Sequence, residues 1–280
     1  MTTGTLYVVA TPIGNLEDFN PRAQKILQDA DLILAEDTRH SKILLQQFAI
    51  NTPVKSFHEH NEEHVVAAIL DDLKDGKNIA LISDAGTPLI NDPGYRLVSA
   101  AMSEQLKVVP IPGPSAITCA LSVSGQPTDR FVYEGFLPAK KIARRNRLLQ
   151  LTTEERTMVF YEVPHRISGC LEDMIEIFGT ERIATIAKEL TKYHETIRKD
   201  TLENLLEWLQ QDDARTRGEF VLVVQGSGAH AVTESEQIRI LEILLETLPV
   251  KQAAAVAAKI LNTGRNPLYR MALKLKQPAE

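Results

Sequence analysis

Short apolar runs alternate with amphipathic segments over the first ~120 residues, and this alternation restricts the fold more than any other feature of the sequence. The apolar runs predict four buried strands: Leu6–Ala10, Leu32–Ala35, Ile79–Ser83 and Lys107–Ile111. The segments between them have helical spacing: Pro21–Ala30, Ser41–Phe48, Glu62–Lys74 and Pro93–Glu104. This order indicates a mainly parallel sheet covered by helices, which binds ligands at the carboxyl ends of its strands.

The second half of the chain repeats this rhythm with different spacing. Strands are predicted at four places: Phe131–Gly135, Thr157–Tyr161, Arg182–Ala187 and Phe220–Val224. Helices are predicted at Pro164–Phe178 and Leu202–Gln211, and a helix over Ser115–Ser124 would join the two halves. We therefore expect an α/β protein with two α/β domains, residues 1–120 and 121–228, and a ligand cleft between them.

The composition changes after Gly228, where a third region, residues 229–280, begins. Apolar residues at helical spacing open it: Ile238, Leu241, Leu244, Leu245 and Leu248. An alanine-rich helix is predicted over Val250–Asn262, with Gly264 placed to end it. Asn266 and Pro267 suit the cap and first turn of another helix. This small helical tail is either a docking module or an appendage that only packs.

Charge and hydropathy exclude some classes of protein. The net charge of −6 argues against coating nucleic acid by bulk electrostatics, but it leaves room for a local basic patch on RNA. No apolar run reaches the ~20 residues that span a bilayer, and the first residues lack a signal-peptide pattern. We therefore expect a cytoplasmic protein without a membrane segment, in which Cys119 and Cys170 are buried free thiols.

The most informative loop is Ser83–Gly94, which follows a fully apolar strand and is rich in turn-forming residues. The small residues Ala85 and Gly86 would let a ligand approach the backbone, and Asp84 could accept hydrogen bonds from it. Asp92 could cap the next helix. The simpler alternative is a tight turn in which Asp84 satisfies local N–H groups.

Two other turns follow strands in the same way. Ala10–Asp18 contains a single glycine, Gly14, so it lacks the G-x-G-x-x-G pattern that binds a dinucleotide. It is either a plain connection or a floor for a ligand without phosphates. Pro110–Ala116 holds three prolines and then the small Ser115 and Ala116, which suits either the clamping of a flat ring or a rigid hinge between domains.

Acids and imidazoles follow two further strands, in Ala35–Arg39 and Ser56–Asn61. His58 and His60 would point the same way along an extended chain, but H-x-H alone is a weak metal signal. No metal site is expected, and roles in proton transfer or in positioning a substrate fit better. A purely structural ion pair of Arg39 with Asp37 or Glu59 is the alternative.

Five basic residues gather in one short segment: Lys140, Lys141, Arg144, Arg145 and Arg147. In a net-acidic chain such a cluster predicts either a surface that faces phosphates or an ordinary solvated helix face. His165 and Arg166 add basic groups after a later strand.

In their order along the chain, the motifs resemble one enzyme family. They are A-T-P-I-G-N-L-E-D (10–18), A-E-D-T-R (35–39), S-F-H-E-H-N (56–61), S-D-A-G-T-P-L-I-N-D-P-G (83–94), P-G-P-S-A (112–116), Y-E-V-P-H-R (161–166) and A-K-E-L-T-K-Y-H-E-T (187–196). Between about Leu6 and Gly226 the chain resembles the 16S ribosomal RNA (cytidine-2′-O)-methyltransferases of the tetrapyrrole-methylase superfamily. Enzymes of that superfamily that act on tetrapyrroles have a glycine-rich first turn, which this chain lacks.

The resemblance implies an enzyme that uses S-adenosyl-L-methionine, bound between two α/β domains, and that forms a homodimer. It implies a decoding-centre cytidine of 16S rRNA in the small ribosomal subunit as the target, and the 2′-hydroxyl would distinguish RNA from DNA. The cofactor residues that it implies are Pro12, Ile13, Ser83, Asp84, Ala85, Gly86, Ser115, Ala116, Tyr161 and Leu190.

A ribose hydroxyl is a weak nucleophile, so a general base should help. Glu36, Asp37 and His58 are the candidates, and the sequence does not choose among them. The residues expected to hold RNA are Arg39, Asn61, Lys140, Lys141, Arg144, Arg145, Arg147, His165 and Arg166. The alternatives are a methyltransferase of the same fold that acts on a tetrapyrrole or a protein side chain, and a non-enzymatic ribosome-assembly factor.

Overall fold

A computed structural model of the chain describes residues 3–227, 234–261 and 263–276. Contacts within it define two units, one that reaches to Gly226 and one that begins at Ser227. The first unit contains two β-sheets and the second is helical. The expected α/β class with a helical tail is therefore confirmed, whereas the division at residues 120 and 228 stays a prediction. Gly228 lies outside the described residues.

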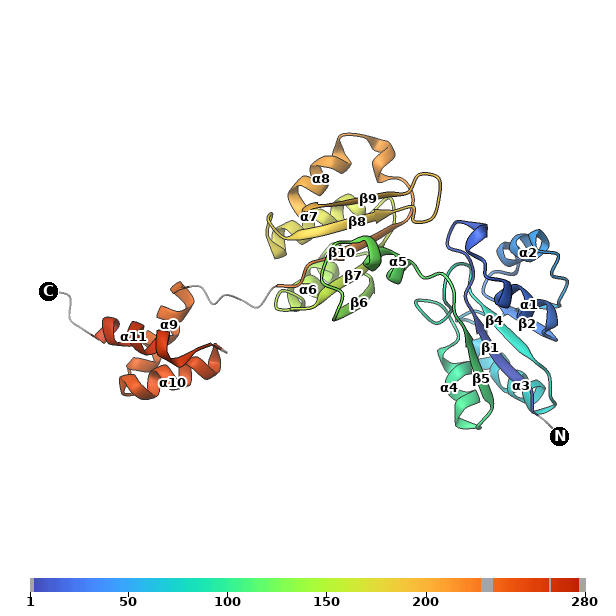
Figure 1. Ribbon diagram of the computed structural model, residues 1–280, viewed down its shortest axis with the longest axis horizontal. Helices are drawn as coiled ribbons and strands as arrows, with labels where there is room; N and C mark the ends of the chain where they lie inside the picture. The colour runs from blue at the N-terminus through green and yellow to red at the C-terminus, as the bar shows by residue number, and fades with distance from the viewer. Residues whose placement is uncertain (1–2, 228–233, 262, 277–280) are drawn as a thin grey trace. The chain divides into compact units, whose positions relative to one another are not determined.

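The first sheet has five parallel strands in the order β3-β2-β4-β1-β5 (Figure 1). Its strands are β1 (Thr5–Val9), β2 (Leu32–Ala35), β3 (Val54–Ser56), β4 (Ile79–Ile82) and β5 (Lys107–Ile111). The central strand β1 pairs in parallel with β4 on one side and β5 on the other, so Tyr7 lies between Ala80 and Val109. All five carboxyl ends therefore meet at one edge, where the predicted motif loops follow them.

Helices cover both faces of this sheet, because successive strand residues point to opposite sides. On one face Leu34 and Leu81 pack against α3 (Glu62–Lys74) and α4 (Tyr95–Ser103). On the other face Ile33 and Ile82 pack against two further helices, α1 (Pro21–Asp29) and α2 (Thr38–Gln47). A short 3-10 turn, η1 (Leu16–Asp18), precedes α1.

Helix starts differ from the prediction at two motif loops. Helix α2 begins at Thr38, three residues early, because the Asp37 carboxylate accepts a hydrogen bond from the backbone N–H of Arg39. Helix α4 begins at Tyr95 after Gly94, whose φ of 130° ends the loop. Asp92 therefore does not cap α4. Its side chain faces a cavity instead.

The second sheet has the order β6-β7-β10-β8-β9 and is mixed. Its strands are β6 (Phe131–Phe136), β7 (Thr157–Glu162), β8 (Ile183–Lys188), β9 (Thr196–Thr201) and β10 (Phe220–Val224). Only β6 and β7 pair in parallel; β10 runs antiparallel to both of its neighbours, and β9 runs antiparallel to β8. The sequence pattern missed β9, and it implied a strand before Ser56–Asn61 without giving the bounds of β3. Neither strand has the buried apolar run used to recognise the others.

Helices cover the second sheet unequally. One face packs against α6 (Lys141–Gln150), α7 (Ile167–Phe178) and α8 (Leu202–Gln210), and η2 (Asp213–Thr216) follows α8. The other face receives only the joining helix α5 (Ala116–Val123), through Ile117, Ala120 and Leu121. The site lies between the first sheet and this face of the second sheet, which α5 covers only in part.

The second unit contains α9 (Glu234–Leu245), α10 (Val250–Ile260) and α11 (Arg265–Lys276). Leu241, Ala254, Ala257, Leu268 and Ala272 form its buried core, as the apolar spacing of this region predicts. Helix α11 begins at Arg265, so Asn266 lies inside the first turn rather than capping it. The predicted end of α10 at Asn262 lies outside the described residues.

Cys170 is buried and Cys119 is half-buried, and both are free thiols. Across the parts of the chain that the structure describes, no helix combines the length and the apolar character that crossing a bilayer requires.

Candidate functional site

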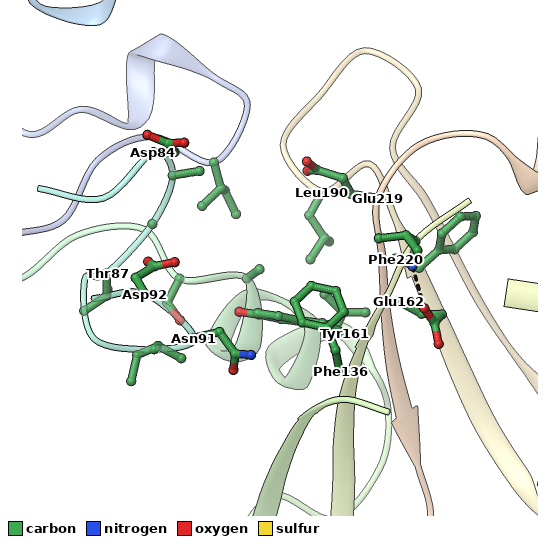
Figure 2. Close-up of a pocket in the computed structure, with 18 of the residues that line it drawn as sticks. Asp84, Thr87, Asn91, Asp92, Phe136, Tyr161, Glu162, Leu190, Glu219 and Phe220 are labelled. Atoms are coloured by element: carbon green, nitrogen blue, oxygen red, sulfur yellow. Dashed lines mark hydrogen bonds between the residues drawn. The ribbon is translucent and has the colours of Figure 1, made fainter. Parts of the chain in front are cut away.

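A cavity of about 360 Å³ lies between the carboxyl edge of the first sheet and the face of the second sheet that carries α5 (Figure 2). Its volume is in the range of small-molecule sites. The lining residues come from both halves: Ile13, Glu36, Asp84, Ala85, Gly86, Thr87, Ile90, Asn91, Asp92, Ser115, Ala116, Phe136, Tyr161, Glu162, Val163, Ala187, Leu190, Glu219, Phe220 and Val221. In Figure 2, Asp84, Asn91 and Asp92 face Phe136 and Tyr161 across it.

Two motif loops form one wall of this cavity together. The backbone of Thr11 in the first turn pairs with Gly86 in the long loop, through N–H to carbonyl bonds of 2.9 and 3.1 Å. Gly86 has a φ of 81°, and an added Cβ would come within 3.3 Å of Ile13. A residue without a side chain is therefore needed here to keep both the backbone conformation and the open wall.

Carboxylates give the cavity its electrostatic character. Glu36, Asp84, Asp92, Glu162 and Glu219 line it, and the described lining residues include no lysine, arginine or histidine. Glu162 and Glu219 have cationic partners outside the cavity, in Arg166 and Lys192. The salt bridges found among the described residues leave Glu36, Asp84 and Asp92 unpaired. The cavity therefore favours a cationic ligand and disfavours a phosphorylated one.

Among the acids that line the cavity, Glu36 has the most strongly raised pKa. Burial, together with the negative charges of Asp92 and Asp84, raises the pKa of Glu36 to about 7. The Asp84 carboxylate also accepts a hydrogen bond from the backbone N–H of Asp37 at 3.1 Å, which fixes the backbone next to Glu36. Glu36 can therefore accept and release a proton near neutral pH.

Asp92 was missed as a site residue because its position before Pro93 resembles a helix cap. Burial raises the pKa of Asp92, and a hydrogen bond with Ser83 partly opposes this effect. Ser83 itself is buried and does not line the cavity. It instead forms a hydrogen bond with the Asp92 side chain, which does line the cavity.

Eight of the ten predicted cofactor residues line the cavity: Ile13, Asp84, Ala85, Gly86, Ser115, Ala116, Tyr161 and Leu190. Pro12 and Ser83 do not line the cavity. Pro12 directly precedes the lining residue Ile13, and Ser83 forms a hydrogen bond with the lining residue Asp92. The structure brings these residues together from five segments of the chain. Their role in holding a cofactor stays a prediction.

The three predicted bases have different surroundings. Glu36 lines the cavity, and neither Asp37 nor His58 does. The Asp37 carboxylate is paired with the Arg39 guanidinium at 2.8 Å, and this partner and the capped backbone hold the pKa of Asp37 well below its usual range. Asn61 is engaged within its own turn, since it accepts from the N–H of His58 and donates to the carbonyl of Ser56.

The basic segment forms α6, and carboxylates pair with most of its cations. The Arg144 guanidinium is 2.6 Å from Asp173, and both side chains are buried. Arg145 pairs with Glu176 and Arg147 with Glu134. Lys141 is 3.8 Å from Asp173, whereas Lys140 is exposed. Arg144 is therefore a structural residue, and Lys140 is the cation most available to a phosphate.

The other predicted RNA contacts divide in a similar way. His165 is exposed just before α7. Arg166 binds the Glu162 carboxylate and the carbonyl of Leu137, so it ties the end of β7 to the loop after β6. No group of three or more histidine, cysteine, aspartate or glutamate side chains is arranged to hold a metal among the residues described.

Sequence reasoning missed several lining residues. Thr87, Ile90 and Asn91 lie in a motif that was recognised, so only their roles were overlooked. Phe136 ends β6 and Glu219 precedes β10, and no pattern in the sequence distinguished them. They enter the site only because the two sheets face each other.

Models of two protein families match the chain. The model described as Tetrapyrrole (Corrin/Porphyrin) Methylases matches residues 5–206, and the model described as RsmI C-terminal HTH domain matches residues 231–276. Solved structures similar to the chain include a cobalt precorrin-4 methyltransferase, with a TM-score of 0.57 and 16% identity over 78% of this chain and 94% of that one. Diphthine synthase matches with a TM-score of 0.58 and 14% identity, over 79% of this chain and 90% of that one. These two likenesses show a common fold.

Closer relatives share the full length. A protein named Ribosomal RNA small subunit methyltransferase I from Pseudomonas aeruginosa strain PAO1 is 50% identical over 98% of both chains. The protein of the same name from Xylella fastidiosa strain Temecula1 is 51% identical over 96% of this chain and 98% of its own. That from Escherichia coli O157:H7 is 48% identical over 97% and 95%. The chain therefore belongs to the tetrapyrrole methylases and, within them, to the ribosomal RNA small subunit methyltransferase I family.

Proposed function

We propose that this chain is an S-adenosyl-L-methionine-dependent methyltransferase that methylates the 2′-hydroxyl of a cytidine in the decoding centre of small-subunit ribosomal RNA. The acidic cavity carries the proposal, since Glu36, Asp84 and Asp92 line it without basic neighbours. The names of relatives at 48–51% identity support ribosomal RNA as the substrate. The cytidine and the 2′ position come from the motif resemblance alone, and the chemistry of the cavity supports the methyl donor.

The residues present fit the proposed donor. S-adenosyl-L-methionine carries a sulfonium and an ammonium group, which three unpaired carboxylates would attract. Ala85, Gly86, Ser115 and Ala116 present little bulk, so a ligand can lie against their backbone. Tyr161 and Leu190 would close the opposite side. When bound, the donor supplies an electrophilic methyl group and keeps the electron pair of the broken C–S bond as a neutral thioether.

Glu36 is the general base in this proposal. The attacking ribose oxygen forms the new C–O bond, and its proton passes to the Glu36 carboxylate, so charge and atoms balance without a metal. A base with a pKa near 7 is half ionised at neutral pH and still basic enough to accept the proton. Asp37 is a weaker base, because its pairing with Arg39 stabilises the ionised carboxylate.

Alignment of the reactants is the other contribution of the protein. Holding the hydroxyl and the methyl carbon in one line can supply several kcal/mol. The hydrogen bond from the backbone N–H of Asp37 to the Asp84 carboxylate joins the loop after β2 to the loop after β4. This bond therefore fixes the position of Glu36, which accepts the proton, relative to the loop of Asp84, which would hold the donor.

For the RNA, we assign phosphate contacts to exposed basic side chains near the cavity. Lys140 and His165 are exposed at the starts of α6 and α7, and Arg39 is exposed near Glu36. Arg144 is excluded from this role by its burial against Asp173. We further infer from the family resemblance that the protein works in the cytoplasm as a homodimer.

Transfer of labelled methyl groups tests the proposal directly. The chain is incubated with labelled S-adenosyl-L-methionine and, separately, with small ribosomal subunits, free 16S RNA or a tetrapyrrole. Labelling of a ribose in small-subunit RNA is the expected result, and light scattering of the purified protein measures the dimer. If only the tetrapyrrole is labelled, the chain is a tetrapyrrole methyltransferase and the proposed function is wrong. An RNA-binding assembly factor would bind RNA and label nothing.

A further inference from the structure

Two apolar side chains that line the cavity are exposed to solvent. The exposed fraction is 39% for Ile90 and 45% for Phe136. Other apolar lining residues, such as Leu190 and Phe220, are buried. Single exposed apolar residues are common on protein surfaces, but these two enter the same cavity from opposite halves of the unit. They therefore form an apolar part of its solvent side.

A β-bulge places Phe136. In the pairing of β6 with β7, Tyr133 lies opposite Val159 and Gly135 lies opposite Phe160, so one extra residue is inserted. Without it, positions 133 and 136 would point to opposite faces of the sheet. With it, both rings contact Tyr161, at centroid distances of 5.1 and 5.5 Å.

The bulge is fixed from both sides. The inserted Glu134 turns away and pairs with Arg147 of α6. Gly135 has a φ of 67°, and the position of a Cβ on it would be 3.1 Å from the Asn91 Oδ1. The same oxygen accepts a hydrogen bond from the Tyr133 hydroxyl at 2.7 Å. Phe136 is therefore held at the cavity although its exposed ring gains little from packing.

The backbone on either side of Ile90 is strained. Leu89 and Asn91 have φ values of 73° and 66°, a region that side chains with a Cβ rarely adopt. Such conformations are costly and occur often where a ligand is held. The Asn91 side chain lies against Gly135. Ile90 precedes Asn91 and Phe136 follows Gly135, so the segments that carry these two apolar residues lie next to each other.

We propose that Ile90 and Phe136 form an apolar slot that holds the base of the target nucleotide, an inference that rests on the proposed function. The small-residue loops and the unpaired acids of the cavity suit the cationic donor. Ile90 and Phe136 instead offer exposed apolar surface to an uncharged ring. Aromatic rings commonly stack on single-stranded bases, and apolar contacts tolerate the neutral face of cytosine.

Binding measurements test the slot without depending on catalysis. The probe is a short oligocytidylate, compared with an abasic oligomer of equal length, with S-adenosylhomocysteine present. The wild-type protein should prefer the cytosine oligomer by roughly tenfold, a typical contribution of one stacked base. Phe136→Leu and Ile90→Ser should remove most of this preference, whereas Phe136→Tyr should retain it.

Two controls test whether the effect is specific to the slot and whether donor binding is unchanged. Met102→Ala changes an exposed apolar residue of α4 that does not line the cavity, and it should keep the wild-type preference. Titration calorimetry of the slot variants with S-adenosyl-L-methionine should give affinities within about twofold of wild type. If Phe136→Leu weakens donor binding tenfold and leaves the cytosine preference intact, the ring holds the donor and the slot proposal is wrong.

Methyl transfer to small subunits, measured in parallel, separates this inference from the proposed function. A cytosine preference that depends on Phe136, found in a protein that methylates no ribosomal RNA, would support the slot and overturn the proposed activity. Normal methylation by a wild-type protein that binds both oligomers equally would overturn the slot alone.

Discussion

The hydroxyl of Tyr133 donates a hydrogen bond of 2.7 Å to the Asn91 Oδ1, and this bond links strand β6 of the second sheet to the long loop that follows β4 of the first. Burial and the neighbouring Tyr161 raise the pKa of Tyr133, so its hydroxyl stays protonated and remains a donor. Asn91 lines the cavity, and Tyr133 contacts the lining residue Tyr161. The bond therefore holds the two walls of the site at a fixed separation.

Removing this bond should loosen the site. Tyr133→Phe leaves the Asn91 oxygen without its donor, and the loss of one such bond typically costs about 1 kcal/mol of unfolding free energy. We expect a lower urea midpoint and a weaker affinity for S-adenosyl-L-methionine in calorimetry. Tyr95→Phe, at a tyrosine that is 74% exposed, is the control and should change neither value. Wild-type behaviour of both variants would mean that the bond does not hold the walls.

Glu36→Gln should slow the chemical step by at least about 10²-fold, because the amide cannot accept the ribose proton. Single-turnover assays with saturating donor and small subunits measure this step, and the affinities for both ligands should change little. In the wild type the rate should rise with pH up to about 7, and this dependence should disappear in the variant. Asp37→Asn and His58→Ala should have smaller effects. A near-normal rate for Glu36→Gln would remove Glu36 as the base.

The raised pKa of Glu36 also affects stability. The folded protein holds the Glu36 proton up to about pH 7, whereas the unfolded chain releases it near the ordinary glutamate pKa of 4.5. The free energy of unfolding contributed by this group therefore falls as pH rises between these values. After allowance for solvent screening of a partly exposed group, the loss is about 1 kcal/mol. Glu36→Gln should be more stable than wild type at pH 8 and equal to it near pH 4 in urea unfolding. Equal midpoints at pH 8 would contradict this.

Gly86→Leu should abolish donor binding in a folded protein. The new side chain would start 3.3 Å from Ile13 and fill the wall where Thr11 and Gly86 pair. Gly179→Leu is a matched control, since Gly179 also has a positive φ, of 93°, but has open space around its Cβ position. Both variants carry backbone strain, and only the first changes the cavity. Calorimetry and circular dichroism give the result, and unchanged binding heat in folded Gly86→Leu would remove this loop from the donor site.

Arg144→Ala should destabilise the fold by roughly 3–5 kcal/mol, because it leaves Asp173 buried without its cation. Arg145→Ala, whose partner Glu176 is more exposed, should cost less than about 1 kcal/mol. Urea unfolding distinguishes the two. Equal midpoints would show that the buried pair is dispensable.

The double variant Lys140→Ala and His165→Ala should retain the fold and bind RNA more weakly. Each lost phosphate contact should flatten the log–log dependence of affinity on salt by roughly one. Donor affinity should stay the same, because neither residue lines the cavity. A salt dependence identical to wild type would assign the RNA contacts to another surface.

Local patterns in the sequence were enough to predict the architecture. Buried strands such as Ile79–Ile82 have uninterrupted apolar runs, and helices such as α3 have matching periodicity. Because a parallel sheet aligns the ends of its strands, the motif loops could be expected at one edge. The ordered motifs identified the family, and the comparisons confirmed it. Strands β3 and β9 lack a buried apolar run, so their bounds did not follow from the pattern.

The sequence by itself determined which loops carry the site and which residue types they offer, since these follow from short-range order along the chain. Only the tertiary structure decided how those residues are used. It separated Glu36 from Asp37, although they are neighbours, because one lines an acidic cavity and the other pairs with Arg39. It paired Arg144 with Asp173, 29 residues away, and brought Phe136 into the site through a bulge. The burial of a side chain and the charges around it depend on which distant segments of the chain come together. No local sequence pattern specifies those contacts.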